Sequence, residues 1–233
     1  MAGTEITITA ADGGSFMGYL ATPAGGKGPG IVVIQEIFGV NKVMRDLTDG
    51  YAAAGYVALC PDLFWRQEPG IQITDQSEAE WKRAFELFQG FDVDKGMADV
   101  ASTIAHLRRT SGCSGKVGTV GYCLGGRLAY LAAARTDADA SAGYYGVYLQ
   151  EHLDEAKKIT KPLLLHMAEK DQFAPPEVRE QVVAALKGNP HTTIHVYPGM
   201  DHAFARVGGA HYDKAAADLA NRRTADFFTA ALR

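Results

Sequence analysis

Cys123 lies in a segment whose residue types and spacing suit nucleophilic chemistry. The apolar run Val117–Val120 precedes it, it sits in the motif Gly-Tyr-Cys-Leu-Gly-Gly, and a helical pattern follows. This is the G-x-S-x-G arrangement of a nucleophile elbow with cysteine in place of serine. The flanking glycines allow a turn too tight for Cβ atoms, and the next N–H, that of Leu124, is predicted to stabilise an oxyanion. A buried structural cysteine is the alternative interpretation.

Two later strand ends supply an acid and a base. The run Leu163–Met167 is followed by Asp171, and the run Thr193–Tyr197 is followed by His202. The chain order nucleophile, acid, base is typical of α/β-hydrolase triads. We expect Asp171 to hold the imidazole tautomer of His202, and His202 to exchange a proton with the thiol and the leaving group. Taken alone, a solvated loop histidine and a helix-capping aspartate explain these two residues as well.

An acidic residue follows a further predicted strand. The run Ile31–Gln35 leads into Glu36 and Ile37, and the N–H of Ile37 is expected to be the second oxyanion-hole donor. A carboxylate beside an oxyanion hole repels developing negative charge unless it is neutral, paired or moved. We therefore predict that Glu36 is a partner or base for Cys123, because a free thiol needs activation near neutral pH. A surface acid at a loop start is the alternative.

Strands and helices alternate along the rest of the chain. The expected strands are Glu5–Ala10, Ser15–Thr22, Ile31–Ile34, Tyr56–Leu59, Val117–Val120, Ala140–Tyr145, Leu163–Met167 and Thr193–Tyr197. The expected helices run from Asn41 to Ala54, from a capping box at Ser77 and Glu80, from about Asp94 to Arg109, and over Gly125–Arg135, Pro175–Leu186 and Tyr212–Leu232. The first two strands are predicted to form an antiparallel hairpin. This pattern predicts one α/β domain, residues 1–233, with a mostly parallel sheet and helices on both faces.

Composition limits the class of partner and the compartment. A formal net charge of −4 without a basic cluster argues against a nucleic-acid surface and favours a small-molecule partner. The start Met1–Ala10 lacks the pattern of a secretory signal, and no apolar run reaches the about 18 residues that span a membrane. Three cysteines without CxxC spacing predict neither disulfides nor a zinc site, and we interpret Cys60 and Cys113 as packing or loop residues. We expect a cytoplasmic protein, and nothing in the sequence demands more than a monomer.

Five segments together resemble the dienelactone hydrolase family. They are Gln35–Asn41, Cys60–Leu63, Gly121–Gly126, Gly143–Val147 and His202–Arg206. The similarity spans nearly the whole chain, and an EIFG loop paired with a GYCLGG elbow is quite specific to the family. The resemblance implies an α/β-hydrolase that opens carboxymethylenebutenolide, a lactone of chlorocatechol breakdown, to maleylacetate without metal or cofactor.

The resemblance also implies roles for single residues. Glu36 matches a glutamate that contacts the thiol at rest and turns on substrate binding to accept the cysteine proton. Arg206 matches an arginine that binds the substrate carboxylate, a task that suits a bidentate guanidinium; a surface arginine is the alternative. The residues predicted to line the pocket are Phe38, Trp81, Phe85 and Tyr145. Aromatic core packing explains Tyr145, like Tyr144, about equally well.

The departures from the family surround the substrate. Trp81 stands where the family has a second carboxylate-binding arginine, and the adjacent Lys82 and Arg83 would point elsewhere on a helix. Phe85, Phe88 and Ala203 stand in place of a tyrosine, a tryptophan and a serine. Three hypotheses follow: a dienelactone hydrolase, a related cysteine-type carboxylesterase for more apolar esters, and a catalytically weak binding or thiol-sensing protein. The intact triad residues argue against the third.

Overall fold

The computed structural model describes Ala2–Arg233; Met1, the first residue of the segment predicted not to be a signal, lies outside the described residues. The chain groups into two compact units, Met1–Gly118 (unit 1) and Thr119–Arg233 (unit 2), which are described separately. The organisation as one domain therefore stays a prediction. Among the described residues, no helix combines the length and apolar character needed to cross a bilayer.

Unit 1 contains the predicted hairpin and the first strands of the α/β pattern. Its strands are β1 (Thr4–Thr9), β2 (Ser15–Ala21), β3 (Gly28–Ile34) and β4 (Val57–Pro61), side by side in the order β1-β2-β4-β3. β1 and β2 pair antiparallel, which confirms the hairpin, and β3 pairs parallel with β4. β4 is buried throughout and β3 is buried after its first residue, as continuous apolar runs covered on both faces should be.

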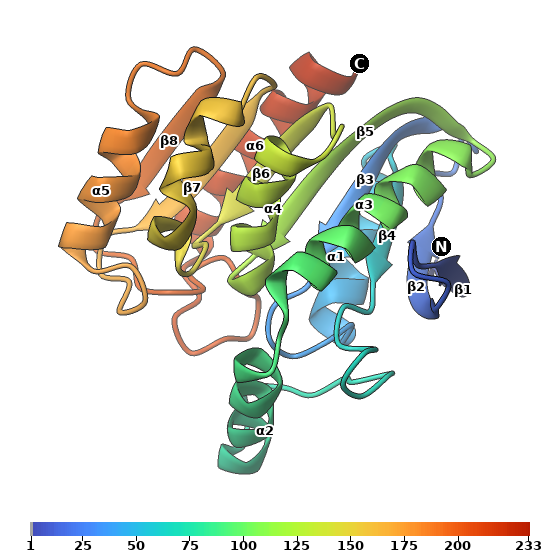
Figure 1. The fold of residues 1–233 in the computed structure, drawn as a ribbon, viewed down its shortest axis with the longest axis horizontal. Coiled ribbons are helices and arrows are strands. Elements are labelled where there is room, and N and C mark those ends of the chain that lie inside the picture. The colour runs from blue at the N-terminus through green and yellow to red at the C-terminus, as the bar shows by residue number, and fades with distance from the viewer. Residues whose placement is uncertain (1) are drawn as a thin grey trace. The chain divides into compact units, whose positions relative to one another are not determined.

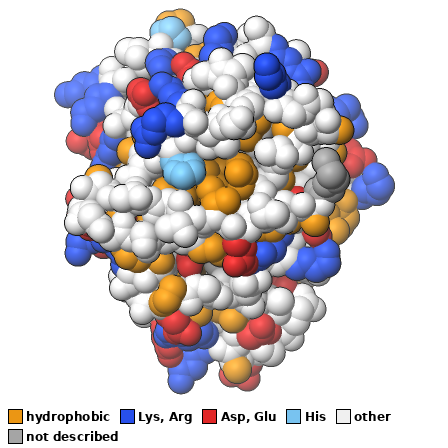
Figure 2. Space-filling view, turned by 90° about the vertical axis from the view of Figure 1, so that its right-hand side faces the viewer, with side chains coloured by type: hydrophobic (Ala, Val, Ile, Leu, Met, Phe, Trp, Pro, Cys, Tyr) orange, Lys and Arg blue, Asp and Glu red, His pale blue; other side chains and the backbone are white. Residues whose placement is uncertain are grey.

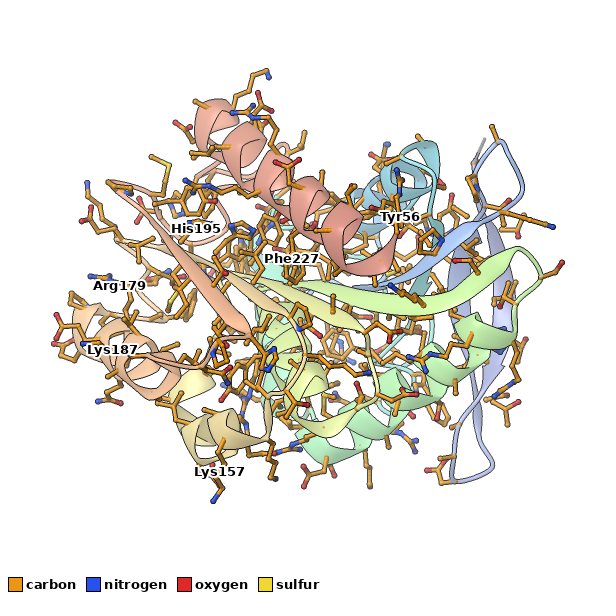
Figure 3. All side chains as sticks on the ribbon, turned by 90° about the horizontal axis from the view of Figure 1, so that it is seen from above. Tyr56, Lys157, Arg179, Lys187, His195 and Phe227 are labelled. Atoms are coloured by element: carbon orange, nitrogen blue, oxygen red, sulfur yellow. The ribbon has the colours of Figure 1, made fainter. Side chains whose placement is uncertain are left out.

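The helices of unit 1 are α1 (Lys42–Ala53), α2 (Glu78–Gln89) and α3 (Val93–Arg109). α1 and α3 pack on opposite faces of β3 and β4 (Figure 3), whereas α2 projects away from the strands of its unit (Figure 1). Asn41 caps α1 by accepting from the N–H of Met44, as the sequence predicts.

The predicted capping box at the start of α2 forms only in part. Ser77 accepts from the N–H of Glu80 at 3.3 Å. The carboxylate of Glu80 does not return to the N–H of Ser77; it accepts from the N–H and hydroxyl of Thr74 at 3.0 and 2.7 Å. The turn before the helix brings Thr74 within reach, so the acid closes that turn instead.

Unit 2 contains three parallel strands and the end of a fourth. They are β6 (Ala140–Tyr144), β7 (Leu163–Ala168), β8 (Thr192–Tyr197) and the end of β5 (Cys113–Tyr122), in the order β5-β6-β7-β8. The register aligns Ser141 with Leu163 and Leu163 with Thr192. The carboxyl ends of these strands therefore lie at one edge, where ligands bind in such sheets.

Helices cover both faces of the strands in unit 2. The helices are α4 (Leu124–Arg135), α5 (Pro176–Leu186), α6 (Lys214–Leu232) and a 3-10 segment, η1 (Leu149–Lys158). α6, with Phe227, lies on one side of the strands, and α5, with Arg179 and Lys187, lies on the other (Figure 3). η1 is missing from the sequence prediction, and non-helical backbone at His152 interrupts it.

On the face of the molecule in Figure 2, Lys and Arg side chains are interspersed with Asp and Glu, and hydrophobic side chains gather near the middle. This mixing of signs agrees with the small net charge of −4.

Candidate active site

Cys123 occupies a strained turn between β5 and α4. Its backbone angles are φ 55° and ψ −114°, and its side chain is buried. A positive φ in a residue with a Cβ costs about 1–3 kcal/mol and persists only where the surroundings enforce it. A nucleophile elbow has such a strained turn at its central residue.

Backbone packing explains the glycines of the elbow. A Cβ atom on Gly121 would lie 1.8 Å from the carbonyl oxygen of Gly125, and one on Gly126 would lie 2.5 Å from that of Tyr144. Only a hydrogen fits at either position. The glycines of the motif are therefore required because the turn, α4 and the end of β6 lie so close together.

Hydrogen bonds tie the elbow to β6. The N–H of Cys123 donates to the carbonyl of Tyr144 at 3.1 Å, and the carbonyl of Cys123 accepts from the N–H of Gly126 at 3.0 Å. Leu124 is the first residue of α4, so its N–H has no partner within the helix. This N–H and the positive end of the helix dipole favour negative charge at the elbow, which suits the oxyanion role predicted for Leu124.

Asp171 and His202 meet after the ends of β7 and β8. His202 Nδ1 lies 2.8 Å from Asp171 Oδ2, and the exposed fractions of the two residues are only 7% and 3%. The other carboxylate oxygen, Oδ1, accepts from the N–H of Phe173 at 2.9 Å. Both oxygens are thus engaged, and the contact with Oδ2 holds the proton of the imidazole on Nδ1.

The structure also couples His202 to Cys123. Burial alone would lower the pKa of His202, but the charge of Cys123 and hydrogen bonding with Asp171 and Cys123 outweigh it and raise the pKa to about 10. His202 Nε2 is buried and has no hydrogen bond of ordinary geometry within Ala2–Arg233. Cys123 therefore acts on the imidazole mainly through its charge, and among the described residues no ordinary hydrogen bond joins it to Nε2.

Two aromatic rings enclose the imidazole. Tyr145 packs edge-on against His202 with centroids 5.2 Å apart, and Phe173 does so at 4.8 Å. Tyr145 is among the residues predicted for the site, whereas Phe173 is not. The position of Phe173, two residues after the acid and beside a proline-rich helix start, is the sequence signal that could have found it.

The loop after His202 is also strained. Ala203 has a φ of 63°, and its carbonyl accepts from the N–H of Arg206 at 2.9 Å. His211 Nδ1 lies 3.2 Å from the carbonyl of His202, a contact that the sequence does not predict. Arg206 is 8% exposed, so the surface-arginine alternative is wrong.

The other predicted site residues belong to unit 1. Glu36 and Ile37 follow β3 and are buried. Phe38 packs edge-on against Trp81 at 5.1 Å, and Trp81 stacks on Phe85 at 5.5 Å, so the structure joins the three predicted pocket residues of this unit in an aromatic ladder. Phe85, at its end, is 37% exposed.

Arg83 does not belong to this ladder. It forms ion pairs with Glu68 and Glu86, in agreement with the prediction that it points elsewhere than Trp81. Trp81 itself donates from Nε1 to the carbonyl of Asp75 at 3.0 Å, which orients its ring.

The remaining cysteines have different surroundings. Cys60 is buried in β4, and burial followed by the charge of Asp62 raises the pKa of its thiol far above the ordinary value. Cys113 begins β5 and is half-buried, so the strand prediction starts too late there. Among the described residues, no group of three or more His, Cys, Asp or Glu side chains is arranged to hold a metal ion.

Residues 16–232 match the sequence profile of the dienelactone hydrolase family. A protein of Azospirillum brasilense, named provisionally as a carboxymethylenebutenolidase, is 59% identical over 97% of both chains. The carboxymethylenebutenolidase of Pseudomonas putida is 40% identical over 95% of this chain and 94% of its own. A crystal structure from Klebsiella pneumoniae, described provisionally as a dienelactone hydrolase, superposes with a TM-score of 0.86 at 30% identity and covers 97% of this chain and 98% of its own.

These similarities extend over the elbow, the acid and the base, and the structural relatives confirm the predicted α/β-hydrolase fold. The chain belongs to the dienelactone hydrolase family.

Proposed function

We propose that this protein hydrolyses a lactone or ester through Cys123 as nucleophile, His202 as acid and base, and Asp171 as the partner of His202. Membership of the family makes the chain a hydrolase of esters or lactones. The observation that carries the triad is the 2.8 Å contact between His202 and Asp171, beside the strained turn that holds Cys123 at the end of β5.

In the proposed reaction, the thiolate of Cys123 attacks the carbonyl carbon and the C=O electrons move to oxygen. The N–H of Leu124 stabilises that oxyanion. The intermediate collapses, the C–O bond of the ring or ester breaks, and the leaving oxygen takes the proton of His202. Water then attacks the thioester while His202 takes its proton, the thiolate leaves, and the carboxylic acid product ionises.

The raised pKa of His202 suits this sequence. With a pKa of about 10, the imidazole holds a proton near neutral pH and can give it to the leaving oxygen. The charged imidazole also favours the thiolate of Cys123. The roles predicted for Glu36, as acceptor of the cysteine proton, and for Ile37, as second oxyanion donor, remain predictions.

The proposal is tested by replacing Cys123. Cys123→Ala should lower kcat/KM for an activated aryl ester by roughly 10⁴-fold or more while the protein stays folded. Cys113→Ala is the matched control, because this half-buried thiol should be dispensable. Wild-type activity in folded Cys123→Ala would end the proposal.

The substrate that we propose is carboxymethylenebutenolide, opened to maleylacetate in the breakdown of chlorinated aromatic compounds. Relatives at 59% and 40% identity carry the name of that activity. Arg206 is a buried residue, and a guanidinium is suited to bind the substrate carboxylate. Arg206→Ala should then impair acidic substrates selectively, and an equal loss on neutral esters would contradict this role.

A second candidate is a more apolar ester. The ladder Phe38–Trp81–Phe85 favours it, because rings replace the polar groups expected there and one remains partly exposed. Comparing kcat/KM for the dienelactone with that for neutral aryl esters separates the two substrates. Trp81→Arg should move the preference towards the acidic lactone if the apolar ester is the substrate.

We further propose a cytoplasmic monomer that needs no cofactor. None of the three cysteines forms a disulfide, which is typical of proteins in a reducing compartment. Sedimentation analysis of the purified protein tests the monomer, and activity after dialysis against a chelator tests the cofactor.

A further inference from the structure

A buried polar cluster lies beneath the proposed site, between the strands of unit 2 and α6. His166 of β7 is completely buried; its Nδ1 lies 2.8 Å from the hydroxyl of Tyr197, and its Nε2 lies 2.9 Å from the hydroxyl of Thr224. Thr224 is also 2.6 Å from the hydroxyl of Tyr144, which donates to Asn221 Oδ1 at 3.1 Å. Three strands are thereby linked to α6, which lies across them (Figure 3).

Counting the available protons gives the donor-to-acceptor direction of this chain of hydrogen bonds. Tyr144 has one hydroxyl proton and gives it to Asn221, so its oxygen accepts from Thr224. Thr224 then has no proton left for His166, and His166 must donate from Nε2.

The other end of the chain agrees with that direction. Neutral His166 with its proton on Nε2 accepts at Nδ1 from the hydroxyl of Tyr197. The oxygen of Tyr197 in turn is a hydrogen-bond partner of Arg223. Burial, with the charges of His195 and Arg223, lowers the pKa of His166 to about 3, so the ring stays neutral. The chain thus runs in one direction from a guanidinium to an amide oxygen.

The same residues support the reacting groups through their backbone and rings. The carbonyl of Tyr144 accepts the N–H of Cys123, and the ring of Tyr144 packs on that of Tyr122 at 4.7 Å. The carbonyl of His166 accepts the N–H of Tyr145 at 2.7 Å, and Tyr145 packs against His202. A shift of either strand end would therefore move the nucleophile or the base.

We propose that the hydrogen-bond chain Tyr197–His166–Thr224–Tyr144–Asn221 positions Cys123 and His202 for the reaction, and that Thr224, which joins Tyr144 to His166, is the positioning residue at its centre. This inference rests on the proposed function, because it assumes that Cys123 and His202 react. Thr224 touches neither residue and acts through Tyr144 and His166.

Thr224→Val tests the inference, because valine keeps the shape and removes the hydroxyl. We expect kcat to fall roughly 10- to 100-fold with KM nearly unchanged, as for a small misplacement of reacting groups. Thr224→Ser should restore most of kcat. Thr229→Val, an exposed site on the same helix, is the matched control.

A spectroscopic measurement tests the proton order separately. In ¹⁵N-histidine-labelled wild-type protein, His166 should carry its proton on Nε2 and should not titrate near neutral pH. A proton on Nδ1 would overturn the inference. So would wild-type kcat in folded Thr224→Val, or a Thr224→Ser no better than Thr224→Val.

If Thr224→Val does not fold, Tyr144→Phe removes one hydroxyl of the same chain and is judged by the same kinetic criteria. Cys123→Ala in the same assay separates the two proposals. An active Cys123→Ala means that the proposed function fails, whereas an inactive Cys123→Ala beside a fully active Thr224→Val means that only the positioning role fails.

Discussion

His202 and His166 are both buried in unit 2, but their surroundings shift the pKa of the two imidazoles in opposite directions. Both imidazoles are buried, and burial alone would lower the pKa of each. Beside His202 lie the side chains of Cys123 and Asp171, which outweigh burial and raise its pKa to about 10. His166 has hydroxyl partners, and burial with the charges of His195 and Arg223 lowers its pKa to about 3. The charge of the neighbours, and not the depth of burial, decides which histidine can hold a mobile proton.

The largest expected effect comes from making the surroundings of His202 neutral. Asp171→Asn replaces the anion by an amide. The lowering effect of burial should then outweigh the remaining contributions, so the pKa of His202 should fall towards that of His166. The amide can also donate to Nδ1, which imposes the wrong tautomer. We expect kcat to fall roughly 10³- to 10⁴-fold, measured with an activated aryl ester. Asp201→Asn, next to the base, is the control; an Asp171→Asn enzyme with normal kcat would contradict the comparison.

A smaller effect is expected from the ring beside the imidazole. Phe173 packs edge-on against His202 with ring centroids 4.8 Å apart and helps to bury the imidazole. Because burial lowers the pKa of His202, Phe173→Leu, which loosens this cover, should raise that pKa and move the alkaline limb of the kcat/KM profile up by a few tenths of a pH unit. Phe227→Leu on α6 should leave the profile in place. An unchanged limb in Phe173→Leu would show that the ring only fills space.

The smallest expected effect is on stability, and it has opposite signs for the two histidines. The pKa of His202 lies above its ordinary value of 6.5 in the folded protein, so its contribution is complete below about pH 6.5 and is lost as pH rises through about 10. The pKa of His166 lies below 6.5, so its contribution is present above about pH 6.5 and is lost as pH falls through about 3.

Thermal unfolding at about pH 5, 7 and 9 measures both contributions. Relative to wild type, Asp171→Asn should lose less Tm between pH 7 and 9, and His166→Gln should lose less Tm between pH 7 and 5. The differences should be a few degrees, because 1 kcal/mol shifts Tm by about 2–4 °C in a chain of this size. Parallel Tm curves for wild type and both variants would refute the comparison.

Much of the fold is predictable because local sequence patterns indicate most of its strands and helices. The expected strand Leu163–Met167 and the helix cap at Asn41 match the structure within a residue. The strand expected to reach Tyr145 ends at Tyr144, because Tyr145 turns to a φ of 38°. η1 escapes prediction because its backbone is irregular and no single hydrophobic period describes it.

In the candidate site, too, some residues could be predicted from the sequence and others could not. The places of Cys123, Asp171 and His202 after strand ends could be predicted from motif and chain order, whereas their catalytic roles stay predictions. The partners of His166 could not be predicted, since Tyr144 and Thr224 are 80 residues apart and meet only through tertiary packing. The local sequence around a histidine in an apolar strand does not indicate which residues will be its hydrogen-bond partners.

The close backbone contact at the elbow has a consequence for protein engineering. Gly143 and Gly146 face the backbone of Gly126 so tightly that an added Cβ would lie 2.9 Å from its atoms. Mutant libraries intended to widen substrate range gain nothing at these positions, because nearly every variant there would displace the turn that carries Cys123. Partly exposed side chains such as Phe85 are better targets, because a new side chain there meets another side chain, Trp81, at the surface and leaves the main chain in place.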